Sequence, residues 1–383
     1  MEYLHQSFSV TFEYRVHFTS ALFHLSNTLF SDFIEQQKGA GTNCKILFVA
    51  DQHVLAHHPF LADQIKAYFD KYRSAELISE VIIIPGGEIA KNDRAHFNSI
   101  VNAVNAYGID RHSYLAGIGG GSVLDVCGFA AAVSHRGIKH IRIPTTVLSQ
   151  NDSGVGVKNG INYKSKKNFL GTFAPPVAVF NDDRFLTTLS DRDWLSGISE
   201  AVKVALIKDA SFFIWLEEQA AALVARDMDA MHYLIKRCAE LHMQHISSGD
   251  PFEAGSSRPL DYGHWSAHKL EQLTDFELTH GEAVAIGIAL DAAYSCISGL
   301  LDEAEYTRII QLLTNLRFSI THPLLDVERE NSQIFLGLEE FQQHLGGRLT
   351  IMLLAGIGKG KEVHTIDREM LRQAGMRLVN GHW

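Results

Sequence analysis

YLAGIGGGSVLDVCGFAAAVS, at residues 114–134, has the pattern of a strand, a turn and a helix. An apolar run, YLAGI, is followed by Gly119, Gly120, Gly121 and Ser122 and then by a segment of helical composition. A strand, a glycine-rich turn and a helix in this order can hold a pyrophosphate, because the helix N-terminus presents free N–H groups. A tight structural turn explains the glycines about equally well. The order of the three elements favours the binding site.

Further apolar runs rich in β-branched residues lie on both sides of this stretch. They are KILFVAD at 45–51, VIIIP at 81–85, HIRIPT at 140–145 and VAVFND at 177–182, and helical patterns separate most of them. Short strands that alternate with helices predict a parallel sheet with crossover helices. The first part of the chain is therefore expected to be a Rossmann-like α/β domain.

After residue 182 the sequence changes to long segments in which apolar residues recur every three or four positions, such as ASFFIWLEEQAAALV and GEAVAIGIALDAAYSCISGLL. This spacing is typical of packed helices. Ser190 followed by Asp193 predicts a capping box that opens the first of these helices. We expect an α/β domain over residues 1–188 and a mainly α-helical domain over residues 189–383.

Composition narrows the class of protein. The chain has 383 residues, 46% of them hydrophobic, which is enough for a large core. A formal net charge of -10 argues against a nucleic-acid partner. The four cysteines form no CxxC pair, the N-terminus has no continuous apolar leader, and no apolar run of about 18 residues occurs. We expect a soluble cytoplasmic protein that does not bind membranes.

Glu200, His264 and His280 stand in the distinctive phrases GISEAVK, LDYGHWSAH and LTHGEAVAIG. One carboxylate and two imidazoles would leave coordination positions open on a divalent ion, as catalysis by zinc, cobalt or manganese requires. Chance is the alternative, because the chain contains 20 histidines. The surroundings of the three residues favour the metal site.

Polar side chains follow several predicted strands. Asp51 ends KILFVAD, Glu88 and Lys91 follow VIIIP, and Thr145 and Thr146 follow HIRIP. Because ligands of open α/β sheets bind beyond the carboxyl ends of the strands, these residues are candidates for contacts with a dinucleotide. An ordinary cap at the end of the strand explains Asp51 equally well.

A glycine-rich polar run, QNDSGVGVKNGINYKSKKNFLG, covers residues 150–171. Its lysines could neutralise a phosphate, while its aspartate and asparagines fix the orientation of hydroxyl groups. A solvated surface hairpin is the alternative, and KSKK taken alone favours it. For Asp152 and Lys158, which lie in glycine-rich backbone, we favour contacts with a phosphorylated polyol.

Two further residues lie one helical turn from predicted metal ligands. Lys203 follows Glu200 by three positions and would point into the same cleft, although a surface ion pair worth about 0.3 kcal/mol has the same spacing. His268 follows His264 by four positions and would share its helix face. A histidine beside a metal-bound alcohol can act as a general base or hold a leaving phosphate.

The phrases GGGSVLDVCGFAAAVSHRG, PTTVLSQNDSGVGVK, KKNFLGTF, SGISEAVK, YGHWSAH and HGEAVAIG resemble motifs of the sugar phosphate cyclases, the family that includes 3-dehydroquinate synthase. The resemblance implies a dehydroquinate synthase-like fold, a homodimer, bound NAD, and a divalent metal, zinc above all, on Glu200, His264 and His280. It also implies a lyase reaction. One alcohol is transiently oxidised with NAD, phosphate is eliminated, the ketone is reduced again, and intramolecular aldol addition closes the ring.

The resemblance assigns roles to individual residues. Those expected to hold or act on the phosphate and hydroxyl groups of the substrate are Arg136, Asp152, Lys158, Lys167, Asn168, Lys203, Asp261 and His268. Those expected to contact NAD are Asp51, His53, Glu88, Lys91, Gly119, Gly120, Gly121, Ser122, Asp125, Thr145, Thr146, Lys158 and Lys167.

Departures from the 3-dehydroquinate synthase pattern concern the substrate. Asp261 stands where those enzymes have asparagine, Arg258 is one residue out of register with an arginine that meets the substrate carboxylate, and His242 replaces a lysine. An aspartate accepts hydrogen bonds from hydroxyl groups but repels a carboxylate. We therefore expect a substrate with a neutral far end, such as sedoheptulose 7-phosphate, and a valiolone-type product, as in the valiolone synthases or less characterised cyclases.

Two other activities stay open from the sequence: 3-dehydroquinate synthase itself, and a metal-dependent NAD alcohol dehydrogenase of similar two-domain plan. A dehydrogenase would produce NADH, whereas a cyclase releases phosphate without a net change in NAD. The sequence does not decide the metal, the stereochemistry of the product, or the roles of His242 and Arg258.

Overall fold

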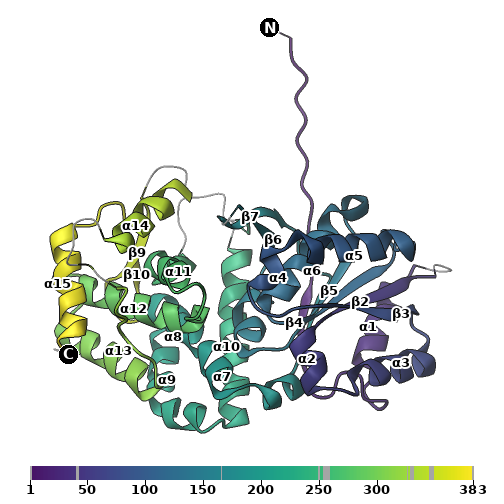
Figure 1. Ribbon diagram of the computed structural model, residues 1–383, viewed down its shortest axis with the longest axis horizontal. Coiled ribbons are helices and arrows are strands. Elements are labelled where there is room, and N and C mark those ends of the chain that lie inside the picture. The colour runs from purple at the N-terminus through teal and green to yellow at the C-terminus, as the bar shows by residue number, and fades with distance from the viewer. Residues whose placement is uncertain are drawn as a thin grey trace. The chain divides into compact units, whose positions relative to one another are not determined.

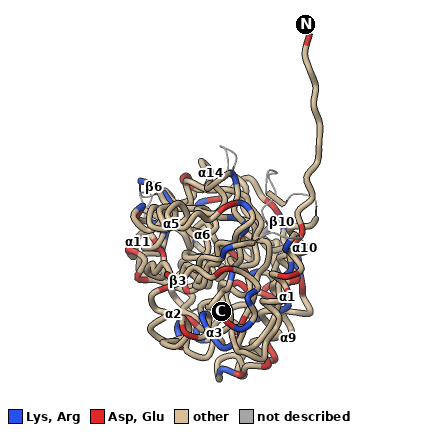
Figure 2. Tube along the Cα trace, turned by 90° about the vertical axis from the view of Figure 1, so that its right-hand side faces the viewer, with Lys and Arg blue, Asp and Glu red and all other residues tan. Residues whose placement is uncertain are grey.

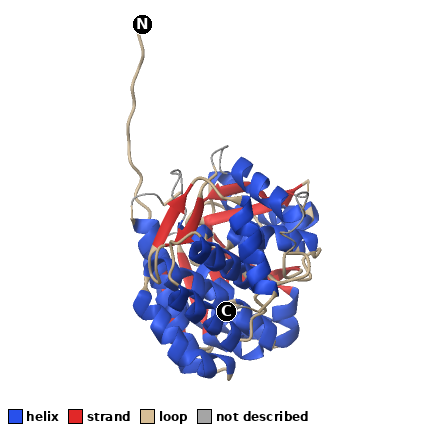
Figure 3. Ribbon diagram, turned by 90° about the vertical axis from the view of Figure 1, so that its left-hand side faces the viewer, coloured by secondary structure: helices blue, strands red, loops and turns tan. Residues whose placement is uncertain are grey.

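The computed structural model describes residues 2–39, 43–164, 166–248, 251–252, 259–325, 327, 332–344 and 349–381. The chain divides into two compact units, whose elements are labelled in Figure 1. Unit 1 comprises residues 1–145 and 157–184, and unit 2 comprises residues 146–156 and 185–383. Figure 3 shows the helices of both units in blue and the strands in red. An α/β part followed by a mainly helical part confirms the predicted fold class.

Unit 1 is built on a six-stranded sheet in the order β1-β8-β5-β4-β2-β3. Its strands are β1 (Arg15–Thr19), β2 (Lys45–Asp51), β3 (Glu76–Ile84), β4 (Tyr114–Gly119), β5 (Lys139–Pro144) and β8 (Ala178–Asp182). Each neighbouring pair is parallel. The carboxyl ends of the predicted strands therefore meet at one edge of the sheet.

Helices pack on both faces of this sheet. They are α1 (Leu29–Gln37), α2 (Gln52–His57), α3 (Leu61–Tyr72), α4 (Ile89–Asn92), α5 (Arg94–Ala106) and α6 (Gly121–Val133), and α6 is followed by the 3-10 turn η1 (Ser134–Arg136). Phe48 of β2 packs against Phe30 of α1 and Phe69 of α3. Leu47 and Val49, on the other face, belong to the cluster that includes α5 and α6. Because β2 is covered on both sides, its sequence is continuously apolar.

The glycine-rich polar run begins in the turn η2 (Ser149–Ser153) of unit 2 and continues in unit 1 as an antiparallel hairpin of β6 (Lys158–Tyr163) and β7 (Lys166–Phe173). Gly160 and Gly171 face each other, and a Cβ atom on either would come within 3.0 Å of a carbonyl oxygen of the opposite strand. The inner strand is buried from Asn159 to Asn162, and it packs on α6. The run is therefore a hairpin, but only its outer strand is solvated.

Unit 2 is mainly helical. Its helices and turns are η2 (Ser149–Ser153), η3 (Asp183–Thr188, shared with unit 1), α7 (Asp191–Ser196), α8 (Ile198–Lys208), α9 (Ala210–Val224), α10 (Met228–Ser247), η4 (Pro259–Asp261), α11 (His264–Leu273), α12 (His280–Ile297), α13 (Glu303–Asn315), α14 (Gln333–His344) and α15 (Arg368–Val379). The short strands β9 (Ile351–Leu354) and β10 (Gly360–Val363) pair antiparallel. α12 packs against α8, α11, α13 and α15. Because it is covered on all sides, α12 is apolar around its whole circumference.

Ser190 caps α7 as predicted, since its hydroxyl oxygen accepts a hydrogen bond from the backbone N–H of Asp193 at 3.1 Å. This helix is short, because α7 and α8 separate at Gly197. The carbonyl of Gly197 accepts a hydrogen bond from the side chain of Asn151 at 2.7 Å, and a Cβ atom here would collide with the backbone of Leu148. A contact with a distant segment thus interrupts the helix.

The four cysteines are unpaired thiols, and Cys44, Cys127 and Cys238 are buried. None of the described helices is both long enough and apolar enough to cross a lipid bilayer.

Candidate functional site

Glu200 lies in the first turn of α8, and only 2% of its side chain is exposed. The ammonium group of Lys203, one turn along, forms an ion pair with its carboxylate. Burial alone would raise the pKa of Glu200, but Lys203 and His264 outweigh burial and hold the pKa well below its usual value. Burial likewise lowers the pKa of Lys203, and Glu200 and Asp152 outweigh it and raise the pKa. The pair is therefore charged and buried, unlike a surface ion pair.

His264 is the first residue of α11 and follows Gly263, which has a φ of 75°. A Cβ atom on Gly263 would lie 2.9 Å from the backbone nitrogen of Ile288, so glycine is needed where α11 begins against α12. The Nδ1 atom of His264 lies 2.9 Å from the carbonyl oxygen of Tyr262. A carbonyl only accepts, so Nδ1 carries the proton. Nε2, 3.5 Å from Oε1 of Glu200, presents its lone pair.

His280 is the first residue of α12, and a capping box of Thr279 and Glu282 fixes this helix end. Its Nδ1 atom lies 3.1 Å from Oε2 of Glu271, a buried carboxylate on α11. A carboxylate accepts, so Nδ1 donates here as well and the Nε2 atom presents its lone pair. Nε2 lies 3.3 Å from Oε1 of Glu200.

These three side chains could hold a divalent cation. One possible ligand atom from each residue lies within 4.8 Å of the other two. Two imidazole lone pairs face a carboxylate, and acceptors that face acceptors repel one another. Oε2 of Glu200 contacts Lys203, whereas Oε1, the oxygen beside both imidazoles, is buried without a well-formed hydrogen bond in the described part of the chain. A zinc-like ion would satisfy all three groups, and nitrogen and oxygen donors of this kind suit it.

Asp152 lies in the π-helical turn η2, which packs against α10. Its Oδ1 atom lies 2.7 Å from Nδ1 of His242 on α10. Burial raises the pKa of Asp152, but the charges of Lys203 and His242 outweigh it, and the pKa lies below its usual value. Asp152 is therefore an anionic acceptor at neutral pH, which suits a hydroxyl group.

Two further predicted residues of unit 2 lie around this group. The ring of His268 has its centre 5.4 Å from that of His264 and 5.9 Å from that of His280. Asp261 ends the turn η4 and is half-buried, and its charge contributes to raising the pKa of Lys203. Unit 2 thus brings together the metal set, Asp261 and His268.

Unit 1 places Asp51 at the carboxyl end of β2. Its side chain accepts a hydrogen bond from the backbone N–H of His53 at 2.8 Å and caps α2, while the side chain of His53 is exposed. Burial raises the pKa of Asp51. The cap that we considered as an alternative is therefore present.

The glycines of the opening stretch end β4 and begin α6. A Cβ atom on Gly119 would lie 2.8 Å from the side chain of Val123 and 3.2 Å from Cβ of Asp51, so glycine is required at this junction. Gly120 is the N-cap of α6 and Gly121 its first residue, and no side chain caps this end. The first N–H groups of α6 are thus left for a ligand such as a phosphate.

A polar network joins α4 and α6 to the hairpin. The Nζ atom of Lys91 lies 2.8 Å from a carboxylate oxygen of Asp125 and also contacts the side-chain oxygen of Asn168. The side chain of Asn162 donates a hydrogen bond to Glu88 at 2.7 Å. Unit 1 therefore brings together four of the residues predicted to bind NAD or substrate. They are Glu88, Lys91, Asp125 and Asn168, and Asn162 belongs to the same hydrogen-bonded network.

Three other predicted residues of unit 1 lie at the start of the hairpin, near its turn and just after the end of β5. Lys158 begins β6 and is exposed, and Lys167 of β7 is half-buried. Arg142, wholly buried in β5, donates a hydrogen bond to the backbone carbonyl of Lys158 at 2.9 Å and so fixes the start of β6. Thr145 is buried, and its N–H donates to the carbonyl of Gly119 at 3.1 Å.

The remaining predicted residues lie apart from these groups or form local contacts. The hydroxyl of Ser122 lies 3.4 Å from Glu88, and Thr146 is hydrogen-bonded within the turn that opens η2. Arg136 is exposed beyond the last residue of α6, about 20 Å from the glycines at the start of that helix. Arg258 lies outside the described residues.

Two buried carboxylates behind the histidines were not predicted. Glu271 accepts a hydrogen bond from His280, and the spacing HKLE in α11 was the available signal for it. Asp291 of α12 accepts hydrogen bonds from Trp265 at 2.9 Å and from the N–H of Gly263 at 3.0 Å. Burial raises the pKa of Asp291 to about 7.

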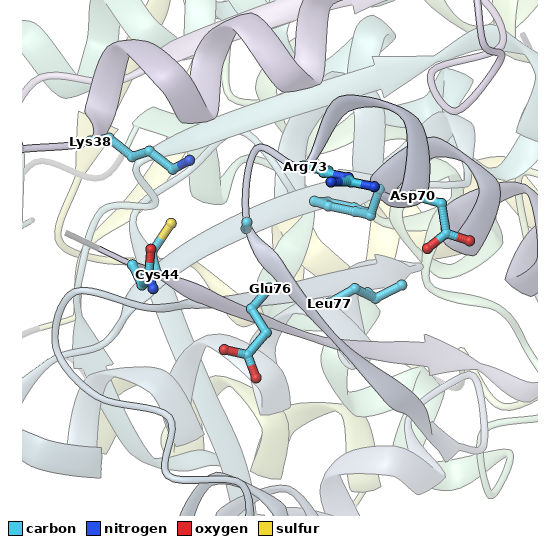
Figure 4. A pocket seen from close by; sticks show the side chains of 9 residues that line it. Lys38, Cys44, Asp70, Arg73, Glu76 and Leu77 are labelled. Carbon is cyan, nitrogen blue, oxygen red and sulfur yellow. The ribbon is translucent and has the colours of Figure 1, made fainter. Parts of the chain in front are cut away.

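A separate pocket in unit 1 opens at the amino-terminal ends of β2 and β3 (Figure 4). Its lining includes Lys38, Cys44, Asp70, Arg73 and Glu76. Ligands of open parallel sheets bind at the opposite, carboxyl ends of the strands. The pocket is therefore not part of the candidate site.

A parallel α/β unit followed by a helical unit with a Glu/His/His set is the arrangement expected of a sugar phosphate cyclase. The family model described as 3-dehydroquinate synthase N-terminal matches residues 81–196, and the model described as 3-dehydroquinate synthase C-terminal matches residues 197–336. Together they cover more than half of the chain. The chain belongs to the 3-dehydroquinate synthase-like family of sugar phosphate cyclases.

Curated relatives support this assignment. The 3-dehydroquinate synthase of Pseudoalteromonas atlantica is 35% identical over 301 residues, which are 76% of this chain and 81% of that protein. A 3-dehydroquinate synthase of a Shewanella species is 36% identical over 331 residues, which are 86% of this chain and 89% of that protein.

Solved structures are similar over nearly the whole chain. The 2-epi-5-epi-valiolone synthase of Streptomyces hygroscopicus, with NAD+ and Zn2+ bound, has a TM-score of 0.88 and 29% identity, and the match covers 99% of this chain and 100% of that one. A 2-deoxy-scyllo-inosose synthase with NAD+ and Co2+ has a TM-score of 0.76 and 25% identity, with 94% and 96% of the chains covered. An iron containing alcohol dehydrogenase, at 14% identity and a TM-score of 0.57, shares the fold alone.

Proposed function

We propose that the chain is an NAD- and divalent-metal-dependent cyclase that converts sedoheptulose 7-phosphate into a valiolone-type cyclitol with elimination of phosphate. Membership of the family supports the reaction class. The similarity to a valiolone synthase that contains NAD+ and Zn2+ supports the cofactors and the product class. The proposed enzyme is a homodimer, as the family resemblance implies.

In this proposal unit 2 holds the metal through Glu200, His264 and His280. The donor set fits the ion, because two imidazole nitrogens and a carboxylate oxygen lie within 4.8 Å of one another. A bound ion of this kind acidifies a coordinated alcohol. Lys203 stays cationic beside the anionic Glu200 and is available to a substrate hydroxyl or phosphate oxygen.

Unit 1 binds NAD, with the pyrophosphate at the uncapped N-terminus of α6 and Asp51 and Lys91 beside it. The free N–H groups and the close approach of the backbone at Gly119 support this role. The cofactor supplies the transient oxidation that makes the neighbouring C–H bond acidic. Lys158, Lys167 and Asn168 contact the substrate or its phosphate.

Asp152 orients the reacting alcohol. Its lowered pKa keeps it anionic, so it accepts a hydrogen bond from a hydroxyl group. His268, beside the two metal histidines, moves the proton or holds the leaving phosphate. The elimination itself then needs little more than a positioned phosphate, because the C–H bond beside a ketone is already acidic.

The substrate is inferred from one observation above all: Asp261, an aspartate, stands where 3-dehydroquinate synthases have asparagine. Asp261 is half-buried close to Lys203, and Asp152 is anionic. A substrate carboxylate brought near Asp261 would be repelled in a poorly screened environment, whereas a hydroxyl group would donate to it. His242 pairs with Asp152 and so offers no free fixed cation in place of the lysine of 3-dehydroquinate synthases.

A second candidate, 3-dehydroquinate synthase, is favoured by the names of relatives that are 35% and 36% identical. Incubation of the enzyme with NAD, zinc and each candidate substrate distinguishes the two functions. Sedoheptulose 7-phosphate and the heptulosonate 7-phosphate that 3-dehydroquinate synthases cyclise are offered in parallel, and products are identified by NMR. We expect a cyclitol from the first and negligible turnover of the second. Formation of dehydroquinate from the heptulosonate, with no product from sedoheptulose 7-phosphate, would contradict the proposal and support 3-dehydroquinate synthase.

A further inference from the structure

The end of α7 lies directly against the start of α12. A Cβ atom on Gly281 would lie 1.9 Å from the carbonyl oxygen of Ser196, so glycine is required for this close approach. Gly281 directly follows the proposed metal ligand His280, and Ser196 precedes the proposed ligand Glu200 by four residues. One contact between two helices therefore lies next to two of the three proposed ligands.

Arg192 of α7 bridges the same two helices. Its Nε and Nη2 atoms donate hydrogen bonds to Oε1 and Oε2 of Glu282 on α12 at 2.8 and 2.6 Å. Nη2 also donates to the carbonyl oxygen of Glu277, in the loop before α12, at 2.5 Å. A guanidinium group that donates to both oxygens of a carboxylate fixes its orientation as well as its distance. Arg192 thus holds the loop and the first turn of α12 against α7.

The carboxylate of Glu282 also fixes the backbone beside His280. Its Oε2 atom accepts hydrogen bonds from the backbone N–H and from the hydroxyl of Thr279, both at 2.8 Å. The side chain of His280 is 26% exposed, so the imidazole is not enclosed by packing. A set of metal ligands works only when its members are placed within about 0.5 Å. Contacts that fix the start of α12 therefore bear on the position of the metal.

α7 is itself anchored to its neighbours in unit 2. Trp194 is buried, and its Nε1–H group donates a hydrogen bond to the carbonyl oxygen of Leu223 on α9 at 2.8 Å. The carbonyl oxygen of Ser196 accepts a hydrogen bond at 2.9 Å from the hydroxyl of Ser199, the residue before Glu200. α7 therefore gives Arg192 a fixed base that is joined to the first turn of α8, where Glu200 lies.

An ion pair by itself does not mark a functional residue. Figure 2 shows that acidic and basic residues are interspersed along the chain, and exposed pairs usually contribute little to stability. Arg308 and Glu217 form a similar pair between α13 and α9, with hydrogen bonds of 3.0 and 2.5 Å and with 43% and 27% of the side chains exposed. The exposed fractions of Arg192 and Glu282 are 52% and 29%. What distinguishes Glu282 is its contact with the residue before His280.

We propose that Arg192 is a positioning residue for the metal site, which acts through Glu282 to fix His280 relative to Glu200. The proposal rests on the metal role that the proposed function gives to these ligands. It assigns a part in metal binding to an exposed side chain outside the ligand set. Loss of the bidentate contact frees the first turn of α12, so both the affinity for the ion and the geometry of its ligands should change.

Zinc affinity, measured by competition with a chromogenic chelator, tests the proposal. We expect Arg192→Ala to bind zinc about tenfold more weakly, since loss of a support of a metal ligand typically costs at least that much. Lysine keeps the charge but not the bidentate geometry, so Arg192→Lys should recover only part of the affinity. Arg308→Ala removes the matched pair and should bind zinc like the unchanged protein. Equal affinities for Arg192→Ala and Arg308→Ala would overturn the proposal.

Bound Co2+ reports on geometry, because its visible absorption spectrum depends on the arrangement of its ligands. At saturating Co2+ the bands of Arg192→Ala should differ in position or intensity from those of the unchanged protein, whereas those of Arg308→Ala should coincide with them. A spectrum of Arg192→Ala identical to that of the unchanged protein would overturn the positioning role.

Glu282→Gln is the second variant, which serves also if Arg192→Ala does not fold. Glutamine can close the capping box but offers only one oxygen to Arg192, so zinc binding should again be weaker. The double variant should bind zinc no more weakly than Arg192→Ala, because both changes remove one contact. Additive losses would overturn the path through Glu282. If the unchanged protein binds neither zinc nor Co2+, the metal site of the proposed function fails, and the role of Arg192 fails with it.

Discussion

The Nδ1 atom of His242 lies 2.7 Å from a carboxylate oxygen of Asp152. The two residues are 90 positions apart and come from the turn η2 and the helix α10, so only the fold brings them together. Gly156 leaves room for the imidazole, because a Cβ atom there would lie 3.2 Å from Nε2 of His242. His242 therefore belongs to the group around Lys203 and Glu200, a role that its sequence position alone did not assign.

The double variant His242→Lys with Asp261→Asn should shift substrate preference. The lysine adds a cation and the asparagine removes a negative charge, so both changes favour a substrate carboxylate. Phosphate release from the heptulosonate 7-phosphate should rise at least about tenfold, and release from sedoheptulose 7-phosphate should fall. His232→Lys, on an exposed site of α10, is the control. Unchanged rates with both substrates would contradict the role of these positions.

Glu271→Gln should weaken metal binding. The carboxylate holds the Nδ1–H group of His280 and thereby directs Nε2 to the metal position. Loss of such a support typically costs about 10- to 100-fold in metal affinity. Competition with a chromogenic chelator measures the zinc affinity directly, without reference to activity. Gln272→Ala, next in the chain and exposed, should leave the affinity unchanged. Equal affinities for Glu271→Gln and the control would refute the prediction.

Because Asp291 ionises, the free energy of unfolding should decrease as the pH rises. Burial raises its pKa from 3.8 to about 7, so the folded chain binds its proton more tightly than the unfolded chain does. Stability from this group is present at low pH and is lost between about pH 4 and pH 7. Asp291→Asn cannot ionise, so the stability advantage of the unchanged protein over this variant should shrink by about 3 kcal/mol between pH 5 and pH 8. Urea denaturation gives the free energy of unfolding of both proteins at each pH. A constant difference between the two proteins from pH 5 to pH 8 would show that Asp291 does not titrate in this window.

Lys158→Ala should abolish phosphate release, because an ammonium group that binds the phosphate is lost. Lys166→Ala, an exposed lysine of the same hairpin, should retain most of the activity. Phosphate release by both variants in a coupled assay gives the comparison. Undiminished turnover by Lys158→Ala would remove this lysine from the mechanism.

Local pattern was enough for much of the fold. KILFVAD and YLAGIG coincide with β2 and β4, because each strand is buried and continuously apolar. The cap at Ser190 was also predictable, since it depends on residues three positions apart. The break at Gly197 was not, because it results from contacts with Asn151 and Leu148.

In the candidate site, too, residues marked by their local sequence were predicted, and residues defined by contacts between helices were not. Glu200, His264 and His280 were predicted as one group from their residue types, and they converge in unit 2. Glu271 and Asp291 were missed, because each is defined by a contact between α11 and α12 that no local pattern contains.

The proposed enzyme eliminates phosphate from a sugar phosphate without consuming NAD. To test this, phosphate and NADH are followed together while the enzyme, supplied with NAD and zinc, acts on sedoheptulose 7-phosphate. We predict one phosphate for each cyclitol formed and no accumulation of NADH. Accumulation of NADH in step with substrate consumption, without phosphate release, would identify a dehydrogenase and contradict the proposed cyclase activity.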